Sequence, residues 1–159
     1  MKKSEEHYVR WFSELGSGDV PVVGGKNASL GVMISSLAER GVRVPQGFAT
    51  TAEAYWEVIK ENDLKGRIEW ALEQKRNGEK SLHEAGDEIR RLLWNCKLPQ
   101  GLQERLRSSY RELSEKYGKK EVDVAVRSSA TAEDLPQASF AGQLESFLNI
   151  KGEEAISDS

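Results

Sequence analysis

The chain has 159 residues and a net charge of −3, with 38% hydrophobic and 31% charged residues. This length fits one domain or one lobe of a larger domain. The acidic balance argues against nucleic acid or an anionic membrane as a partner, because both attract a basic surface, whereas a nucleotide needs only one or two placed cations. No apolar run reaches the ~18 residues of a membrane span and no signal peptide is recognisable, so a cytoplasmic location is expected.

The first half of the chain alternates short extended pieces with helices. Residues 8–15 alternate weakly between apolar and polar side chains and predict a strand, followed by a Gly-rich loop. Apolar residues at helical spacing predict a helix over 26–40. After an extended, Pro-containing piece, a capping box of Thr50 with Glu53 predicts a helix from residue 51 to 76 with a break inside it.

The second half continues with two helices and then changes period. A second capping box, Ser81 with Glu84, opens a predicted helix over 81–96, and another apolar stripe predicts a helix over 100–118. From residue 122 the apolar residues recur at every second position, which is typical of a strand. We expect strands near 122–128 and 145–150 in one sheet covered by helices, which is an α/β fold.

The histidines, the cysteine and the tryptophans are expected to have structural roles and not catalytic ones. His7 lies in a terminus expected to fray, His83 lies inside the second capping box, and neither has neighbours at metal-ligand spacing. No Ser/His/Asp or Cys/His set is apparent, and the single cysteine, Cys96, sits on an apolar helix face. Helical spacing also places three tryptophans in the expected core: Trp56, Trp70 and Trp94.

The helical block, roughly residues 51–118, lies between two flanks rich in glycine and serine, so chemistry is expected in the flanks. In the first flank, Gly24 and Gly25 precede Lys26 at the start of a helix. Glycines there let backbone N–H groups approach an anion, and a lysine could reach a phosphate. A P-loop is excluded because Val20 replaces its first glycine and Asn27 its Ser/Thr. An ordinary turn with a solvated lysine is the alternative.

The second flank begins where the predicted strand ends at Arg127. From residue 128 to 143 no apolar period survives, so about 16 residues form a loop, and loops of that length are usually functional or disordered. Small residues leave room for a ligand, hydroxyls can bond phosphate oxygens, and Arg127 can clamp phosphate in bidentate fashion. Glu133 and Asp134 could pair with a cation or be solvated. A solvated surface loop is the alternative.

Three segments together resemble a known family: "GGKNASLGVM", "VPQGFATTAEAY" and "VAVRSSATAEDLPQASFAGQLESFLNIKG". They are similar to the N-terminal ATP-binding part of phosphoenolpyruvate synthases, and more loosely to pyruvate phosphate dikinases and rifampin phosphotransferases. The last segment is long and specific, whereas the helical middle matches only in layout. Because the chain stops about one turn into a helix that begins near Glu153, we expect residues 1–159 to be a piece of a longer protein.

The resemblance implies an ATP-grasp-like nucleotide-binding domain of two lobes with ATP between them. This chain would be the N-terminal lobe, with the helical block inserted between its strand-forming flanks and the phosphate-loop region over 122–150. Lys26 and Arg127 would contact the ATP phosphates and should therefore lie close together. Four loop residues would lie over the triphosphate: Ser129, Thr131, Gly142 and Gln143.

The resemblance also implies chemistry that this chain does not carry. A histidine on a swivelling domain takes the β-phosphoryl group of ATP and passes it to pyruvate on a barrel domain, giving phosphoenolpyruvate, AMP and phosphate. Neither histidine of this chain has that setting, so no catalytic residue is assigned here. The Mg²⁺ ligands are expected in the second lobe. A rifampin phosphotransferase, or a non-catalytic nucleotide- or protein-binding module, remains open as an alternative.

Overall fold

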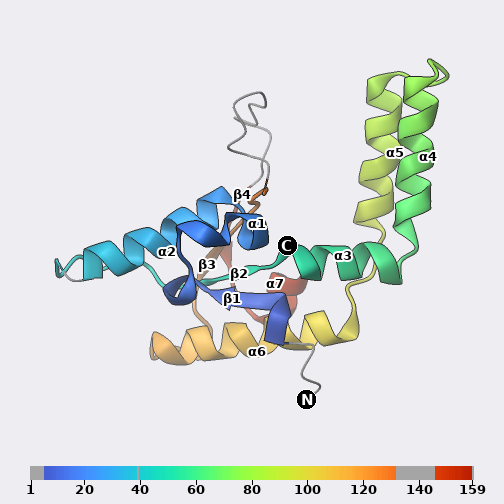
Figure 1. Cartoon of the computed structure of the whole chain (residues 1–159). Coiled ribbons are helices and arrows are strands. Elements are labelled where there is room, and N and C mark those ends of the chain that lie inside the picture. Colours follow the sequence, from blue (N-terminus) through green and yellow to red (C-terminus); the bar gives the residue numbers. More distant parts are fainter. Residues whose placement is uncertain (1–5, 39, 132–145, 159) are drawn as a thin grey trace. The chain divides into compact units, whose positions relative to one another are not determined.

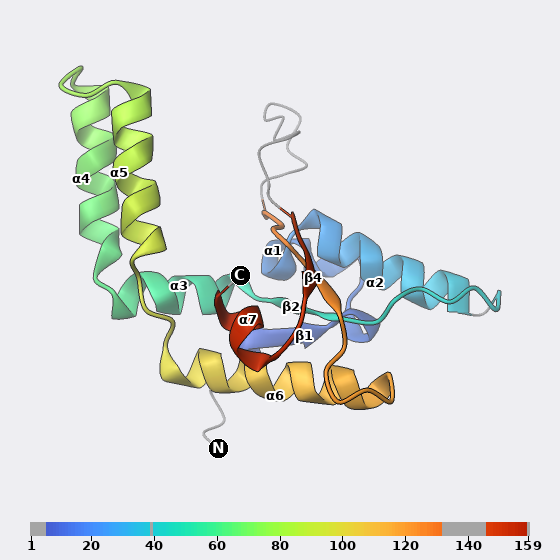
Figure 2. The ribbon, with the colours of Figure 1, turned by 180° about the vertical axis from the view of Figure 1, so that it is seen from behind.

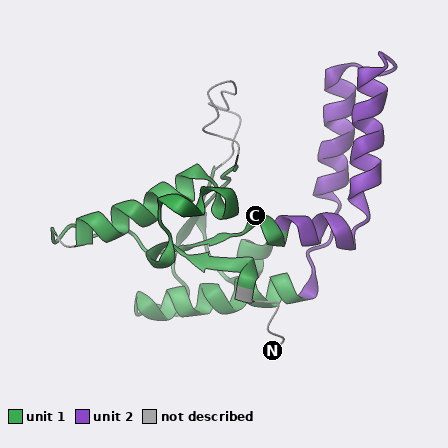
Figure 3. Cartoon of the chain, in the orientation of Figure 1, with its two compact units in different colours: residues 1–54, 101–159 green, residues 55–100 purple. Residues whose placement is uncertain are grey.

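A computed structural model describes residues 6–38, 40–131 and 146–158 (Figure 1). The chain divides into two compact units, residues 1–54 with 101–159, and residues 55–100 (Figure 3). Each unit is described by itself. The mixture of helices and short antiparallel strands confirms the α/β class at its coarse level.

In the part of the chain that the structure describes, the first unit contains short 3-10 helices, longer helices and four strands. They are, in chain order, η1 (Glu6–Tyr8), β1 (Val9–Trp11), η2 (Phe12–Glu14), η3 (Ser17–Asp19), α1 (Val20–Val23), α2 (Gly25–Ala38), β2 (Phe48–Thr50), most of α6 (Gln100–Lys116), β3 (Val124–Arg127), β4 (Ser146–Ile150) and α7 (Glu153–Asp158). The strand expected over 8–15 thus shrinks to three residues. The expected Gly-rich loop contains η3 and α1, where Pro21 suits the first turn of a helix.

In the described ranges the strands form two antiparallel pairs. β1 pairs with β2, with Val9 opposite Thr50 and Trp11 opposite Phe48. β3 pairs with β4, which confirms the expected sheet of residues 122–128 and 145–150. Seen from behind, β3 and β4 run side by side and β4 leads directly into α7 (Figure 2).

The core of this unit gathers on α6. Trp11, Tyr110, Leu113 and Val122 form one buried cluster, against which Phe48, Val124 and Ile156 pack. The rings of Trp11 and Phe48 meet edge to face with centroids 5.6 Å apart. A second cluster joins the residues around α1 and α2 to β2: Leu15, Val23, Ala28 and Ala49, with Phe12 and Val20 against them.

The second unit consists of helices, as the sequence predicts. α3 (Ala52–Glu61) leads into it, followed by α4 (Leu64–Arg76) and α5 (Leu82–Trp94). The box at Ser81 is confirmed, because the Ser81 hydroxyl accepts from the Glu84 N–H and the Glu84 carboxylate accepts from the Ser81 N–H. The box at Thr50 is wrong. Thr50 ends β2, and the Thr51 hydroxyl caps α3 by accepting from the Ala54 N–H at 3.2 Å.

The expected burial of the three tryptophans is wrong. Trp56, Trp70 and Trp94 are 60%, 52% and 84% exposed. An antiparallel helix pair buries one narrow stripe, and in α4 and α5 alanines occupy it, since Ala71 and Ala85 are almost wholly buried. Large side chains at the margin of such a stripe stay in solvent. Cys96 is half-buried.

A first prediction concerns Asn149, whose φ of 58° lies in the left-handed region. It sits at a bulge, because β4 advances three residues from Phe147 to Ile150 while β3 advances two. We expect Asn149→Val to cost about 1–2 kcal/mol of unfolding free energy, whereas Asn149→Gly should be nearly neutral. Urea unfolding of the two variants measures the difference, and equal stabilities would contradict the assignment.

A second prediction concerns pH at the start of α5. Two hydrogen bonds lower the pKa of Glu84, one from the Ser81 N–H at 2.8 Å and one from the Ser81 hydroxyl at 2.7 Å, and Ser81→Ala removes the second of them. The hydrogen bond from Arg90 lowers the pKa of Asp87. Both carboxylates therefore stabilise α5 fully above the usual carboxyl range, and this stabilisation is lost as pH falls through the lowered pKa values. In a carboxyl NMR titration, Ser81→Ala should raise the pKa of Glu84 and leave that of Asp87 unchanged. An unchanged Glu84 titration would refute this.

Candidate functional site

The first flank turns at Gly24, between α1 and α2. Its φ of 82° and ψ of 160° are open to glycine and rarely to other residues. The Gly24 N–H donates to Val20 O at 2.9 Å, and its carbonyl accepts from the Ala28 N–H at 3.1 Å. Gly24 therefore ends one helix and begins the next. Gly25 is the first residue of α2, and Lys26 is an exposed residue of its first turn.

The second flank begins at the end of β3. Val124 and Val126 are half-buried while Ala125 and Arg127 are exposed, which confirms the predicted alternation. Arg127 is the last residue of β3 and pairs with Ser146 of β4. The chain then continues through Ser129 and Ala130, both half-buried, to the exposed Thr131.

The two flanks meet directly at Gly24. A Cβ placed on Gly24 would lie 2.3 Å from Ser129 Oγ and 3.0 Å from the carbonyl oxygen of Ala130. The Ser129 hydroxyl donates to Val23 O at 3.3 Å. These contacts join segments more than 100 residues apart, at the end of α1 and just beyond β3.

The predicted phosphate contacts lie on either side of this junction. Lys26 follows Gly24 by two residues and Arg127 precedes Ser129 by two, so the backbone segments that carry the two cations adjoin. Their shared contact with phosphate stays a prediction. Gly142 and Gln143 lie outside the described residues, as do Glu133 and Asp134. The sequence did not predict the contact of Ser129 with Val23. The one signal of a close approach was Gly24, because glycine lets another segment come near the backbone.

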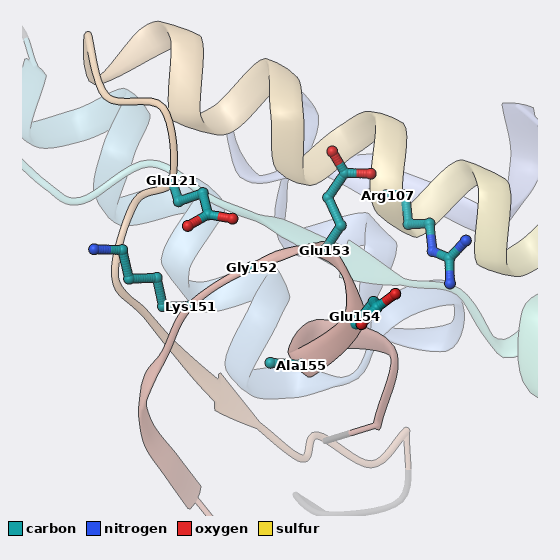
Figure 4. A pocket seen from close by; sticks show the side chains of 7 residues that line it. All are labelled: Arg107, Glu121, Lys151, Gly152, Glu153, Glu154 and Ala155. Carbon is teal, nitrogen blue, oxygen red and sulfur yellow. The ribbon is translucent and has the colours of Figure 1, made fainter.

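A separate cavity of about 540 Å³ lies where β3 begins and β4 ends (Figure 4). It is lined by Arg107, Glu121, Lys151, Gly152, Glu153, Glu154 and Ala155. Arg111 Nε lies 3.7 Å from the Glu153 carboxylate beside it. The lining mixes acidic and basic side chains, so the cavity carries no strong charge of one sign.

Two kinds of feature are missing from the described ranges 6–38, 40–131 and 146–158. No three His, Cys, Asp or Glu side chains gather there so that they could hold a metal ion. None of the helices in those ranges combines the length and the apolar character needed to cross a membrane.

Comparison with known proteins gives a consistent set of relatives. Phosphoenolpyruvate synthase of Aquifex aeolicus is 47% identical over 149 residues, which are 93% of this chain and 17% of that protein. Phosphoenolpyruvate synthase of Neisseria meningitidis is 48% identical over 154 residues, which are 96% of this chain and 19% of that protein. Probable phosphoenolpyruvate synthase of Pyrococcus horikoshii is 37% identical over an alignment of 191 residues that covers 99% of this chain and 23% of that protein.

The chain thus spans about a fifth of the length of these relatives and is matched by them almost from end to end. The family model described as "Pyruvate phosphate dikinase, AMP/ATP-binding domain" matches residues 20–159, which include both flanks and the helical block between them. The chain belongs to the pyruvate phosphate dikinase AMP/ATP-binding domain family.

Proposed function

We propose that residues 1–159 are the N-terminal lobe of an ATP-grasp-like domain, with a helical block over about 51–118 and a phosphate-loop region over about 122–150. The family supports nucleotide binding. The observation that carries the proposal is the contact of Gly24 with Ser129 and Ala130, because it joins the two flanks that bear Lys26 and Arg127.

In this proposal ATP phosphates lie against the junction of the flanks. Lys26 supplies a point charge from the first turn of α2, where the N–H groups of a helix start also favour an anion. Arg127 supplies a planar fork that suits phosphate oxygens. The loop residues Ser129, Thr131, Gly142 and Gln143 complete the set of donors over the triphosphate.

The chemistry of the donor set fits ATP. Phosphoryl transfer depends mostly on positioning and on neutralising the charge of the phosphate oxygens, and cations beside hydroxyl donors serve both needs. The acidic ligands that Mg²⁺ prefers are not grouped among the described residues. In this proposal the Mg²⁺ ligands belong to a second lobe, as the family resemblance implies.

The proposed reaction of the whole protein is the synthesis of phosphoenolpyruvate from pyruvate and ATP, with AMP and phosphate as the other products. The relatives named phosphoenolpyruvate synthase favour this reaction over transfer to rifampin. The phosphohistidine and the pyruvate-binding barrel belong to further domains in this proposal, and this chain contributes to the binding of ATP. A cytoplasmic location stays a prediction from composition.

The proposal predicts that the isolated 159-residue chain does not turn over ATP with pyruvate and binds Mg-ATP weakly. Two charge-assisted contacts contribute about 1.5–3 kcal/mol each, which falls short of the ~8 kcal/mol of micromolar affinity. Titration calorimetry should give millimolar or undetectable binding, restored in a longer protein that carries the second lobe. A low-micromolar dissociation constant for the isolated chain, abolished by Arg127→Ala, would show that the lobe is self-sufficient.

In the longer protein, Arg127→Ala should weaken ATP binding by about tenfold or more, because a phosphate oxygen loses a charged partner. Arg43→Ala is the matched control, since Arg43 is also exposed and lies in the extended piece before β2. Calorimetry with Mg-ATP measures both variants. Equal affinities in the two variants would remove Arg127 from the proposed site.

Gly24 allows a second test of the junction. Gly24→Ala should cost at least about 1 kcal/mol of unfolding free energy and weaken ATP binding, because a methyl group would strain the backbone and push Ser129 away. Gly66→Ala is the control, since Gly66 lies within α4 with nothing within 4 Å of an added Cβ, and it should stabilise the helix slightly. Undiminished ATP binding by Gly24→Ala would separate the junction from the site.

A further inference from the structure

One side-chain oxygen bridges the two strands of the pair β3–β4 at their base. The hydroxyl of Tyr110, in α6, donates to Val122 O at 2.8 Å and accepts from the Gly152 N–H at 2.9 Å. Val122 lies two residues before β3 and Gly152 two residues after β4, so one oxygen joins the entry and the exit of the pair.

The surroundings of Tyr110 make these hydrogen bonds consequential. Tyr110 is 1% exposed and Val122 is 6% exposed, so water does not replace a lost partner there easily. One turn further along α6, the buried Ser114 hydroxyl accepts from the Val122 N–H at 3.2 Å. Both polar groups of the Val122 backbone are therefore fixed by α6.

The same contacts also fix the start of α7. The Gly152 carbonyl accepts from the Ile156 N–H at 3.2 Å, and Ile156 packs against the cluster that contains Tyr110. Hydrogen bonds to both the N–H and the carbonyl of Gly152 therefore fix the direction of the chain between β4 and α7. A change at Tyr110 alters the base of the pair rather than its tip.

Arg127 lies at the far end of this arm. Arg127 is the fifth residue after Val122, so the two Cα atoms lie about 16 Å apart at the rise of a strand. A tilt of about 10° at the base would displace Arg127 by about 3 Å, and functional groups need positions held within about 0.5 Å. The far end has its own contacts, the Ser129 hydroxyl on Val23 O at 3.3 Å and the close approach of Ser129 and Ala130 to Gly24, so the two ends of the pair together fix its direction.

We propose that Tyr110 is a positioning residue for ATP, whose hydroxyl sets the angle of β3–β4 and thereby the place of Arg127. This rests on the proposed function of Arg127 as a phosphate contact. Tyr110 touches neither the proposed ligand nor the reacting atoms. Its effect therefore falls on the affinity for ATP and not on that for pyruvate.

The test compares Tyr110→Phe with Tyr117→Phe. Both variants lose one hydroxyl near α6, but the Tyr117 hydroxyl accepts from the Gln46 N–H at 2.8 Å, ahead of β2, and Tyr117 is 44% exposed. Ser114→Ala is a second variant that loosens Val122 without touching the ring of Tyr110. Hydrogen exchange without nucleotide is measured first, and then steady-state kinetics of the full-length protein.

We expect Tyr110→Phe to speed amide exchange in β3 and β4 at least about tenfold more than in α4 and α5, and to raise the KM for ATP about tenfold with the KM for pyruvate unchanged. Ser114→Ala should act in the same direction, and Tyr117→Phe should do neither. A merely destabilised protein would show faster exchange throughout and a lower active fraction with both KM values unchanged, and this outcome overturns the proposal.

The outcomes separate this proposal from the one on which it rests. If Arg127→Ala raises the KM for ATP but Tyr110→Phe behaves like Tyr117→Phe, the positioning role is wrong and the phosphate site stands. If Arg127→Ala leaves the KM for ATP unchanged, the phosphate site is wrong and Tyr110 has no ATP contact to position, even where it controls exchange in β3 and β4.

Discussion

Neither strand pair of the first unit can hold itself together, and both depend on the buried face of α6. An isolated two-stranded sheet is at best marginally stable in water. β1 contributes Trp11 and the approach to β3 contributes Val122 to one cluster with Tyr110 and Leu113. Lys116, at the end of α6, places its ammonium group 3.5 Å from the centre of the Trp11 ring. α6 is thus the element to which both pairs attach.

This dependence explains how two distant flanks come to share a junction. α6 holds β3 through Val122, and β3 carries its last residue toward the turn at Gly24. The other side of the junction is fixed by packing around α2, where an added Cβ on Gly31 would lie 2.4 Å from the carbonyl oxygen of Leu15. Gly24 and Gly31 therefore serve the same purpose, because each lets a backbone segment approach closer than a side chain permits.

Local sequence patterns predicted the helices well, but they did not predict features that depend on contacts between distant segments. The helix expected over 81–96 is found over Leu82–Trp94, because its capping box and apolar spacing are both local. The sequence pattern favours Thr50 as the cap, because Glu53 follows it by three residues. Contacts with η1 select Thr51, whose N–H donates to Tyr8 O and whose hydroxyl donates to His7 O. The three-residue strands β1 and β2 are too short for any period to show.

The candidate site shows the same division. Period-two spacing placed Arg127 on the exposed face of its strand, and the structure confirms this. That Ser129 would lie on Gly24 followed from no local rule, since the residues are more than 100 positions apart. The adjacency of the flanks was expected from the family resemblance. Helical spacing predicted Tyr110 as part of an apolar stripe. The spacing could not predict that the Tyr110 hydroxyl has two backbone partners.

The exposure of Lys26 and Arg127 bears on how such a lobe can work. Charges in contact with water interact weakly, because a high dielectric reduces the attraction between a cation and a phosphate several-fold relative to an enclosed site. Both residues are exposed, and the backbone segments that carry them meet where Gly24 contacts Ser129 and Ala130. In the proposed site, Lys26 and Arg127 would therefore attract phosphate at full strength only once a second surface excludes water from it. Binding of ATP and closure of the site are thus expected to be one coupled step, in which the geometry at the base of β3–β4 decides where the charge is placed.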